Sequence, residues 1–258
     1  SREQLLSEFL ELCERGTPFG AQTSQHRRVR WLTLDLAAVK DVKTRMQGTI
    51  NDVVLSTVAG ATRRFLRRRG TALAPGAFNV AVPVNVRAQQ QTGERGNHVW
   101  MWILPLPVEF DDARTRFDLL HRDAERRKTS EEAAVGELVT QAFEWTSANL
   151  LPLGIDLVRR AQAFDLLVTN VPGPPLPLYM LDARIVELYP HVPLFEGQSL
   201  AIALFSYAGQ LHWGINADWD NLPDADQFVA DLRDSFDELC GAARLGSVNE
   251  AQRVVGRR

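Results

Sequence analysis

The sequence predicts an α/β fold in which helices flank a mixed β-sheet. First, four apolar residues repeat at i, i+4, i+7 and i+11, the spacing of one buried helix face. They are Val54, Val58, Ala61 and Phe65. Second, two apolar runs in 199–218 surround a short turn, which is typical of a β-hairpin. Third, strand-like and helix-like segments interleave without a regular βαβ repeat, which favours a mixed sheet.

The first part of the domain is expected to form a strand and two helices. Residues 28–36 alternate apolar and polar side chains, which predicts a strand. Residues 37–48 have the pattern of a short helix that stops at Gly48, because glycine commonly ends helices. Residues 49–70 contain the four-residue repeat described above and form the strongest helix pattern, ended by Gly70.

The middle of the chain is expected to contribute three strands and a helical region. Two strands are predicted at 78–87 and 97–107. The second of these is apolar on both faces, which predicts a central, covered strand. Residues 111–163 read as helical with a mostly polar exterior, and 165–170 as a buried strand.

The last third predicts a hairpin followed by a helix. Residues 178–190 are expected to form a strand in two pieces. Within 199–218, two strands flank Ala208 and Gly209, where glycine supplies a permissive backbone for the turn. Residues 223–245 then have the pattern of an amphipathic helix with a proline near its first turn.

The length allows one large domain or two small ones, and the composition is ordinary for a soluble globular protein. The 258 residues are 45% hydrophobic and 24% charged, with a net charge of −3, which gives no electrostatic case for nucleic-acid binding. We divide the chain into an N-terminal amphipathic helix or linker at 1–16, a domain at 17–245 and a polar tail at 246–258. No apolar run reaches the ~18 residues of a membrane span, and the charged start lacks the pattern of a secretory signal.

Several kinds of catalytic or metal site have no sequence signature here. The nucleotide-binding patterns G-x-G-x-x-G and G-x-x-x-x-G-K are absent, as are G-x-S-x-G and H-E-x-x-H. Cys13 and Cys240 are far apart and form no metal or redox motif, which fits a reducing cytoplasm. We therefore expect no bound metal. The five histidines are scattered and none is assigned a catalytic role; they are His26, His98, His121, His191 and His212.

Two groups of polar residues on the 49–70 helix have both a structural and a functional interpretation. Thr49 and Asp52 have the spacing of a capping box, and Asn51 between them could instead face a binding site. At the other end, five arginines could complement the helix dipole on a solvated face. They could alternatively attract phosphates or an anionic lipid surface. These arginines are Arg63, Arg64, Arg67, Arg68 and Arg69.

The stretch after the 165–170 strand combines a polar residue with rigid ones. Pro172 cannot donate to a sheet ladder, so the strand should end there. Gly173 lets the backbone turn. Asn170 either caps loose backbone groups or is held at a site by this rigid exit. Farther along, the Ser206-Tyr207 pair ends another strand, where hydroxyls can be satisfied locally.

Six stretches together resemble one known family. In order they are TINDVVLSTVAGATRRFL, VPVNVR, RGN, LVTNVPGPPLPLY, ELYP and LFSYAGQLHWGINAD. Their order and spacing are similar to the C-terminal half of the bacterial wax ester synthase/diacylglycerol acyltransferase (WS/DGAT) family, from about Thr17 to about Leu245. The sequence departs from the common pattern at Asn85 and Thr169, where serine is more usual, and both changes stay small and polar.

The resemblance implies a chloramphenicol acetyltransferase-like fold of two similar halves with a tunnel between them. It also implies acyl transfer from acyl-CoA, as substrate, to a long-chain alcohol or diacylglycerol, without a bound cofactor. The family's histidine motif, H-H-x-x-x-D-G, belongs to the N-terminal half and is absent here. The resemblance therefore implies no catalytic residue in this chain, and the N-terminal half, in the same precursor or as a separate chain, is the partner that supplies the base.

For this chain the resemblance implies a role in the tunnel wall. The expected wall residues are Asn51, Asp52, Asn170, Pro172, Gly173, Ser206 and Tyr207. The expected contacts to CoA or anionic lipid are Arg63, Arg64, Arg67 and Arg68. The expected location is cytoplasmic, with peripheral contact to membranes or lipid inclusions. The alternative is a catalytically silent domain of the same fold that binds lipid or acyl-CoA, or acts as a scaffold.

Overall fold

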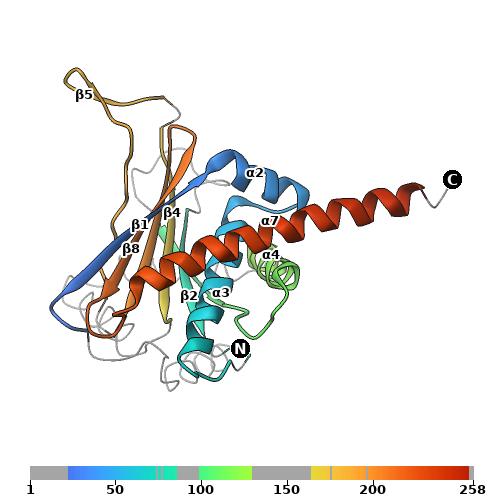
Figure 1. Cartoon of the computed structure of the whole chain (residues 1–258), viewed down its shortest axis with the longest axis horizontal. Coiled ribbons are helices and arrows are strands. Elements are labelled where there is room, and N and C mark those ends of the chain that lie inside the picture. The colour runs from blue at the N-terminus through green and yellow to red at the C-terminus, as the bar shows by residue number, and fades with distance from the viewer. Residues whose placement is uncertain are drawn as a thin grey trace, which may run out of the picture.

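The computed structural model describes residues 23–73, 75–76, 78–85, 99–129, 164–174, 176–195 and 197–255. The described body has two layers: a six-stranded sheet, and helices that cover one of its faces (Figure 1). The sheet is mixed, so the predicted fold class is confirmed. The helix expected over 1–16 lies outside the described residues, as does the part of the helical prediction beyond Thr129 and up to 163.

The sheet places three parallel strands in its middle. In sheet order the strands are β1 (Arg27–Asp35), β8 (Gln210–Asp218), β7 (Leu200–Tyr207), β4 (Leu166–Pro172), β2 (Asn79–Asn85) and β3 (Val99–Pro105). β2, β4 and β7 run parallel, while β1, β8 and β3 are antiparallel to their neighbours. β1 pairs with β8 over its whole length, from Arg27 opposite Asp218 to Asp35 opposite Gln210.

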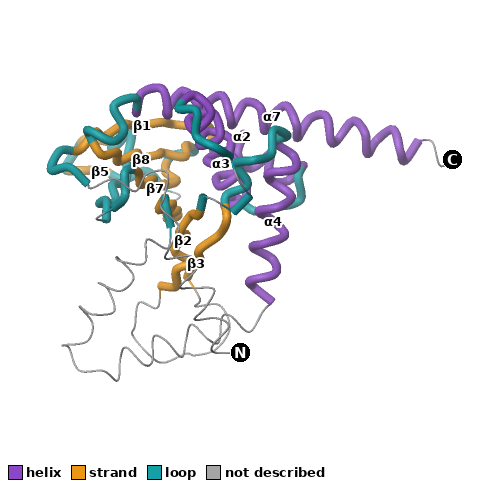
Figure 2. The backbone as a smooth tube through the Cα atoms, turned by 90° about the horizontal axis from the view of Figure 1, so that it is seen from below, coloured by secondary structure: helices purple, strands orange, loops and turns teal. Residues whose placement is uncertain are grey.

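The helices lie on one side of this sheet and pack on one another. They are α2 (Leu36–Arg45), α3 (Ile50–Arg68), α4 (Ala113–Thr129) and α7 (Ala225–Val255). α7 crosses the helix layer and continues past the body of the molecule (Figures 1 and 2). α3 is the most buried of them along its length, because it packs against the sheet, α4 and α7.

The start and the end of α3 agree with the sequence. The Thr49 side chain accepts a hydrogen bond from the backbone N–H of Asp52, and the Asp52 side chain accepts one from the backbone N–H of Thr49. This is the predicted capping box, which satisfies two N–H groups at the helix start. At the other end Gly70 follows the helix in the left-handed region, with φ of +66°.

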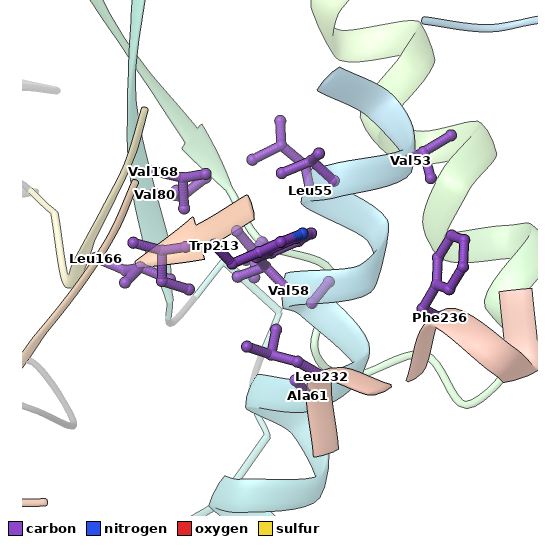
Figure 3. Packing of buried hydrophobic residues seen from close by; sticks show 14 of the residues in the cluster. Val53, Leu55, Val58, Ala61, Val80, Leu166, Val168, Trp213, Leu232 and Phe236 are labelled. Carbon is purple, nitrogen blue, oxygen red and sulfur yellow. The ribbon is translucent and has the colours of Figure 1, made fainter. Parts of the chain in front are cut away.

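Alternation along β8 separates a large core from the opposite face of the sheet. Leu211, Trp213 and Ile215 point toward the helices and are fully buried in the main core. Figure 3 shows the Trp213 ring beside Val58 of α3 and near Leu166 of β4. Replacing such a side chain with alanine typically costs about 3–5 kcal/mol, so this contact holds the two layers together.

A segment that we call the strap, residues 187–195, covers part of the other face. The carbonyl oxygen of Pro190 approaches Gly214 so closely that a Cβ there would lie 1.7 Å from it. Asn216 Nδ2 donates to the carbonyl of Val192 at 3.0 Å. A small apolar cluster on Ala201 and neighbouring residues receives the end of the strap. The sheet is therefore buried on both faces along β8.

A hairpin that we call the arm, residues 176–186, projects from the body. It contains β5 (Tyr179–Met180) and β6 (Ala183–Arg184), which pair only with each other in the described structure (Figure 1). Six apolar side chains of the arm are exposed, and Leu181 is 95% exposed. They are Leu176, Leu178, Tyr179, Met180, Leu181 and Val186. The expected strand in two pieces at 178–190 is thus a short hairpin followed by the strap.

Two other local predictions are wrong. The strand predicted over 97–107 is not central, because β3 stands at the edge of the described sheet and its Met101 side chain is 42% exposed. The apolar pattern indicates that side chains of this strand pack in the core, but it does not indicate how many strands lie beside it. The helix expected to stop at Gly48 ends earlier, at Arg45, and Gln47 follows it in the left-handed region, with φ of +57°.

Candidate functional site

The two asparagines of the most specific motifs meet in space. Asn51 is in the first turn of α3 and Asn170 is near the end of β4, 119 residues later. Asn170 Nδ2 donates a hydrogen bond to Asn51 Oδ1 at 2.9 Å. Each amide carries an acceptor oxygen and two donor hydrogens, so the pair can present further donors to an oxygen of a bound molecule.

This pair lies at the edge where the parallel strands end. β2, β4 and β7 are parallel, so their carboxyl ends share one edge of the sheet. Asn170 is opposite Leu204 in β7, and Pro172 is opposite Ser206. Ligands of open α/β sheets commonly bind outside the carboxyl ends of strands. The first turn of α3 reaches the same edge, where its first N–H groups favour an oxygen-rich or anionic ligand.

The exit from β4 is held against β7. The backbone N–H of Gly173 donates to Ser206 Oγ at 3.1 Å. A Cβ on Gly173 would lie 2.0 Å from the carbonyl oxygen of Ser206 and 2.7 Å from the Phe205 ring. The glycine is therefore required by this close approach, while Pro172 beside it is exposed and is the last residue of the strand.

Asp52 points to a different part of the molecule from Asn51. Its carboxylate is buried, and Oδ2 accepts from the Thr49 backbone N–H and lies 2.8 Å from His121 Nδ1 of α4. The structural interpretation of the capping box is thus confirmed, and the carboxylate contacts α4. We did not expect His121 here; its position four residues after Phe117, on the apolar side of α4, is the only sequence signal.

Tyr207 connects the edge of the sheet to the arm. Its side chain is buried, and its hydroxyl accepts from the backbone N–H of Leu178 at 2.7 Å and donates to the carbonyl of Ile185 at 2.9 Å. The backbone N–H of Ile185 in turn donates to the carbonyl of Leu178. The hydroxyl therefore clamps the base of the arm, next to Ser206 and the exit of β4.

The arginines at the end of α3 are engaged in ion pairs within the chain. Arg64 contacts Glu238 and Arg68 contacts Asp231, both in α7. Arg63 donates to Asp111 and to two backbone carbonyls. Asp111 is also 3.7 Å from Arg67, whose side chain is 60% exposed. The hydrogen bond from Arg63 lowers the pKa of Asp111, and the hydrogen bond to Asp231 raises the pKa of Arg68.

These ion pairs are at the opposite end of α3 from Asn51. The helix rises about 1.5 Å per residue, so Arg63 and Arg68 are about 18 and 26 Å along the axis from the asparagine pair. The structure thus brings Asn51, Asn170, Gly173, Ser206 and the base of the arm together, and it separates the arginines from them. Contact between the arginines and CoA or anionic lipid stays a prediction.

Two further features of the described residues concern metal ions and membranes. No three His, Cys, Asp or Glu side chains gather there in a way that could hold a metal ion. None of the described helices is long and apolar enough to cross a membrane.

Family models match both segments that form the site. The model for the WS/DGAT C-terminal domain matches residues 95–240, more than half of the chain. The model for the wax ester synthase/diacylglycerol acyltransferase catalytic domain matches residues 6–54. Asn170 lies in the first match and Asn51 in the second, so the hydrogen bond between them joins the two matched segments.

Curated relatives are bacterial acyltransferases about twice as long as this chain. A probable diacylglycerol O-acyltransferase of Mycobacterium tuberculosis is 30% identical over 237 residues, which cover 91% of this chain and 50% of that protein. The O-acyltransferase WSD of Acinetobacter baylyi is 27% identical over 219 residues, which cover 83% and 46%. The chain spans about half the length of the curated relatives it matches.

Solved structures agree on the fold. The wax ester synthase/diacylglycerol acyltransferase from Marinobacter aquaeolei VT8 matches with a TM-score of 0.67 at 22% identity, covering 93% of this chain and 57% of that chain. The epimerization domain from the third module of tyrocidine synthetase B matches with a TM-score of 0.56 at 12% identity, covering 94% and 55%. Because the C-terminal-domain model matches more than half of the chain and the fold agrees, the chain belongs to the wax ester synthase/diacylglycerol acyltransferase family.

Proposed function

We propose that this chain forms the C-terminal half of an acyl-CoA-dependent O-acyltransferase that makes wax esters or triacylglycerol. The observation that carries the proposal is the hydrogen bond between Asn51 and Asn170 at the carboxyl edge of the parallel strands. It joins the two motifs that carry the family resemblance, and its amides lie at the edge of the sheet where ligands of α/β sheets commonly bind, which supports the proposal. Acyl-CoA and an alcohol or diacylglycerol are the proposed substrates.

The proposed reaction needs a base from the N-terminal half. Its histidine removes the proton from the acceptor hydroxyl while the oxygen attacks the thioester carbon. The thioester carbonyl becomes a tetrahedral oxyanion, which then collapses, breaks the carbon–sulfur bond and releases CoA as a thiolate that regains the proton. Donors aimed at the developing oxyanion lower the barrier, and loss of one donor can slow catalysis by 10²–10³. Asn51 and Asn170 are the proposed donors or their supports.

The arm supports dependence on another half. Six apolar side chains on one short hairpin are exposed, and the hydroxyl of Tyr207 fixes its base beside the site. Contiguous exposed apolar side chains on a soluble protein commonly mark an interaction surface. The proposed occupant of this surface is the N-terminal half, since the relatives are about twice as long as the chain.

Reconstitution tests the proposal. The 258-residue chain is purified alone and together with the N-terminal half of a family member that carries H-H-x-x-x-D-G, and both are assayed with acyl-CoA and long-chain alcohols or diacylglycerol. We expect turnover only from the pair. Turnover by this chain alone would contradict the need for the other half. A verified complex without turnover would favour the alternative, a silent domain that binds lipid or acyl-CoA.

The asparagine pair gives a sharper test within the reconstituted enzyme. The variants Asn51→Ala and Asn170→Ala should each lower kcat at least about tenfold, because each removes an amide from the site. Their effects should not add, since the two amides act through one hydrogen bond. Gln227→Ala, at an exposed position of α7, is the matched control and should leave kcat unchanged.

A further inference from the structure

His121 and Asp52 form a close, directional contact that the proposed reaction does not use. His121 Nδ1 is 2.8 Å from Asp52 Oδ2. An ionised carboxylate only accepts hydrogen bonds, so the imidazole donates through Nδ1. The carboxylate is buried, whereas the His121 side chain is 30% exposed. The histidine therefore supplies a donor from α4 to a buried acceptor at the start of α3.

The same carboxylate oxygen also closes the capping box. Asp52 Oδ2 accepts from the Thr49 backbone N–H at 2.8 Å. The His121 ring stacks on Phe117, with the two planes 19° apart. A Cβ on Gly48 would lie 2.5 Å from Phe117 Cζ and 2.9 Å from Asp52 Oδ2. α4 thus packs directly on the first turn of α3. His121 links the two helices through Asp52 Oδ2, the same atom that accepts the capping-box hydrogen bond.

Asn51 is the neighbour of Asp52 in this turn. Successive helix residues point about 100° apart, so Asp52 faces α4 while Asn51 faces Asn170 of β4. A rotation or fraying of the turn would move the Asn51 amide directly. Hydrogen bonds weaken steeply when their angle falls. The contact between Asn51 and Asn170 is therefore sensitive to what holds Asp52.

We propose that His121 is a positioning residue of the site: its hydrogen bond to Asp52 fixes the first turn of α3 and thereby the Asn51–Asn170 pair. The hydrogen bond of His121 in the described structure goes to Asp52 and not to either asparagine, so its proposed effect on the pair runs through Asp52. Its importance for catalysis rests on the proposed acyltransferase function, whereas its effect on the geometry of the pair does not. The two parts can be tested separately.

The geometric part is tested on the 258-residue chain by nuclear magnetic resonance. The side-chain amide signal of Asn170 is assigned by its loss in Asn170→Asp. The Asn51→Ala variant removes the hydrogen-bond acceptor and so gives the chemical shift of the Asn170 amide without that hydrogen bond. In His121→Ala and in His121→Phe, which keeps a ring against Phe117, the signal should move toward that chemical shift. His121→Asn restores a donor near Nδ1 and should return the signal toward the wild-type position.

Controls separate this role from a general contribution to stability. Arg122→Ala changes the exposed neighbour of His121 on the same helix and should leave the Asn170 signal in place. If His121→Phe and His121→Ala keep the wild-type signal, the proposal is overturned. Should those variants fail to fold, the nitrogen chemical shifts of the His121 imidazole in the wild-type chain test the proposal instead. A proton on Nδ1 would support the proposal, and a ring protonated only on Nε2 would contradict it.

The catalytic part is tested in the reconstituted enzyme. His121→Phe should lower kcat about tenfold with little change in KM, since small misplacement of a positioned group slows the chemical step. His121→Asn should recover part of kcat. An unchanged kcat in a folded His121→Phe enzyme would overturn this part. An inactive wild-type pair would instead count against the proposed function, while the resonance measurement still decides on the geometry.

Discussion

At Gly173 the surrounding residues, and not the backbone conformation, explain why the position is a glycine. The sequence indicates a turn former between two prolines. In the structure its left-handed freedom is not used, because it is not among the residues with positive φ. The missing side chain is what matters, since Ser206 and Phe205 occupy the space where a Cβ would be. The glycine allows the exit of β4 to lie directly on β7.

Replacing Gly173 with alanine should therefore destabilise the chain. Overpacking of this kind typically costs about 1–3 kcal/mol, and denaturant unfolding would measure the loss. Gly241→Ala is the matched control: it lies in α7, and a Cβ there meets nothing within 4 Å. That variant should gain about 0.5–1 kcal/mol from helix propensity. Equal effects of the two variants would contradict the steric explanation.

At the residue scale, local patterns were predictable and distant contacts were not. The capping box of Thr49 and Asp52 involves a spacing of three residues, so the sequence alone indicates it. The partner of the same carboxylate, His121, is 69 residues away, and one histidine among five carries no mark of that contact. The family resemblance placed Asn51 and Asn170 in one tunnel wall, but the hydrogen bond between them was not predicted, because it depends on how α3 and β4 pack.

At the element scale, the Tyr207 hydroxyl bonds both chain segments at the base of the arm. Tyr207→Phe removes the group that accepts from Leu178 and donates to Ile185. We expect faster hydrogen exchange of the Leu178 amide and a loss of about 1 kcal/mol, the usual net contribution of a hydrogen bond, because both backbone partners are only partly buried. Tyr179→Phe alters an exposed tyrosine of the same arm and serves as the control. Unchanged exchange at Leu178 would show that the clamp is unimportant.

A buried histidine, His212, lies beneath the strap. His212 is fully buried on β8; its Nδ1 is 3.3 Å from Thr33 Oγ1, and its ring packs edge-on against Tyr189 of the strap. Burial lowers the pKa of His212 below its ordinary value of 6.5, and the nearby Glu187 and the Tyr207 backbone offset part of this effect. The folded chain therefore binds this proton less readily than the unfolded chain.

The sign of the pH dependence follows from that difference. Where the unfolded state binds more protons, stability rises with pH. Stability should thus be full above about pH 6.5 and fall as the pH drops through the region between the unfolded and folded pKa values. His212→Gln should flatten this fall in denaturant unfolding between pH 7.5 and 5.5. A slope unchanged by His212→Gln would contradict the assignment.

At the element scale, periodicity predicted what each segment is but not always where it lies. The apolar repeat in 49–70 correctly predicted a helix, and the paired apolar runs in 199–218 correctly predicted a hairpin. Both predictions succeeded because the side chains that define each pattern also fill the core. The pattern of 97–107 was misleading about position. An edge strand can be apolar on both faces when a helix layer covers one of them, and β3 is such a strand in the described sheet.

At the scale of the whole molecule, the arm is the surface that the other half is proposed to cover. A triple variant, Leu176→Ser, Met180→Ser and Leu181→Ser, should change stability little, because these side chains are exposed. It should bind less hydrophobic dye and should fail to associate with the N-terminal half. Phe110→Ser removes an exposed apolar side chain elsewhere and should retain association. Association of the triple variant at wild-type strength would rule out the arm as the interface.

The overall architecture was predictable in class but not in its outward features. Interleaved helices and strands indicated a mixed sheet, and the structure has one. Nothing in the residues 176–186 distinguishes a projecting hairpin from a covered strand, since its apolar side chains would suit either environment. Their exposure depends on tertiary contacts, which the residue types alone do not specify.

The pairing of β1 with β8 has a consequence for how the chain is made. Arg27 is opposite Asp218, 191 residues later. A ribosome adds about 5–20 residues per second, so β1 waits about 10–40 seconds for its partner strand to be synthesised. During that time its exposed edge and the apolar face of α2 have no native cover from β8 or α7. Chaperones that bind nascent chains should therefore engage the first part of this sequence before its last strand emerges.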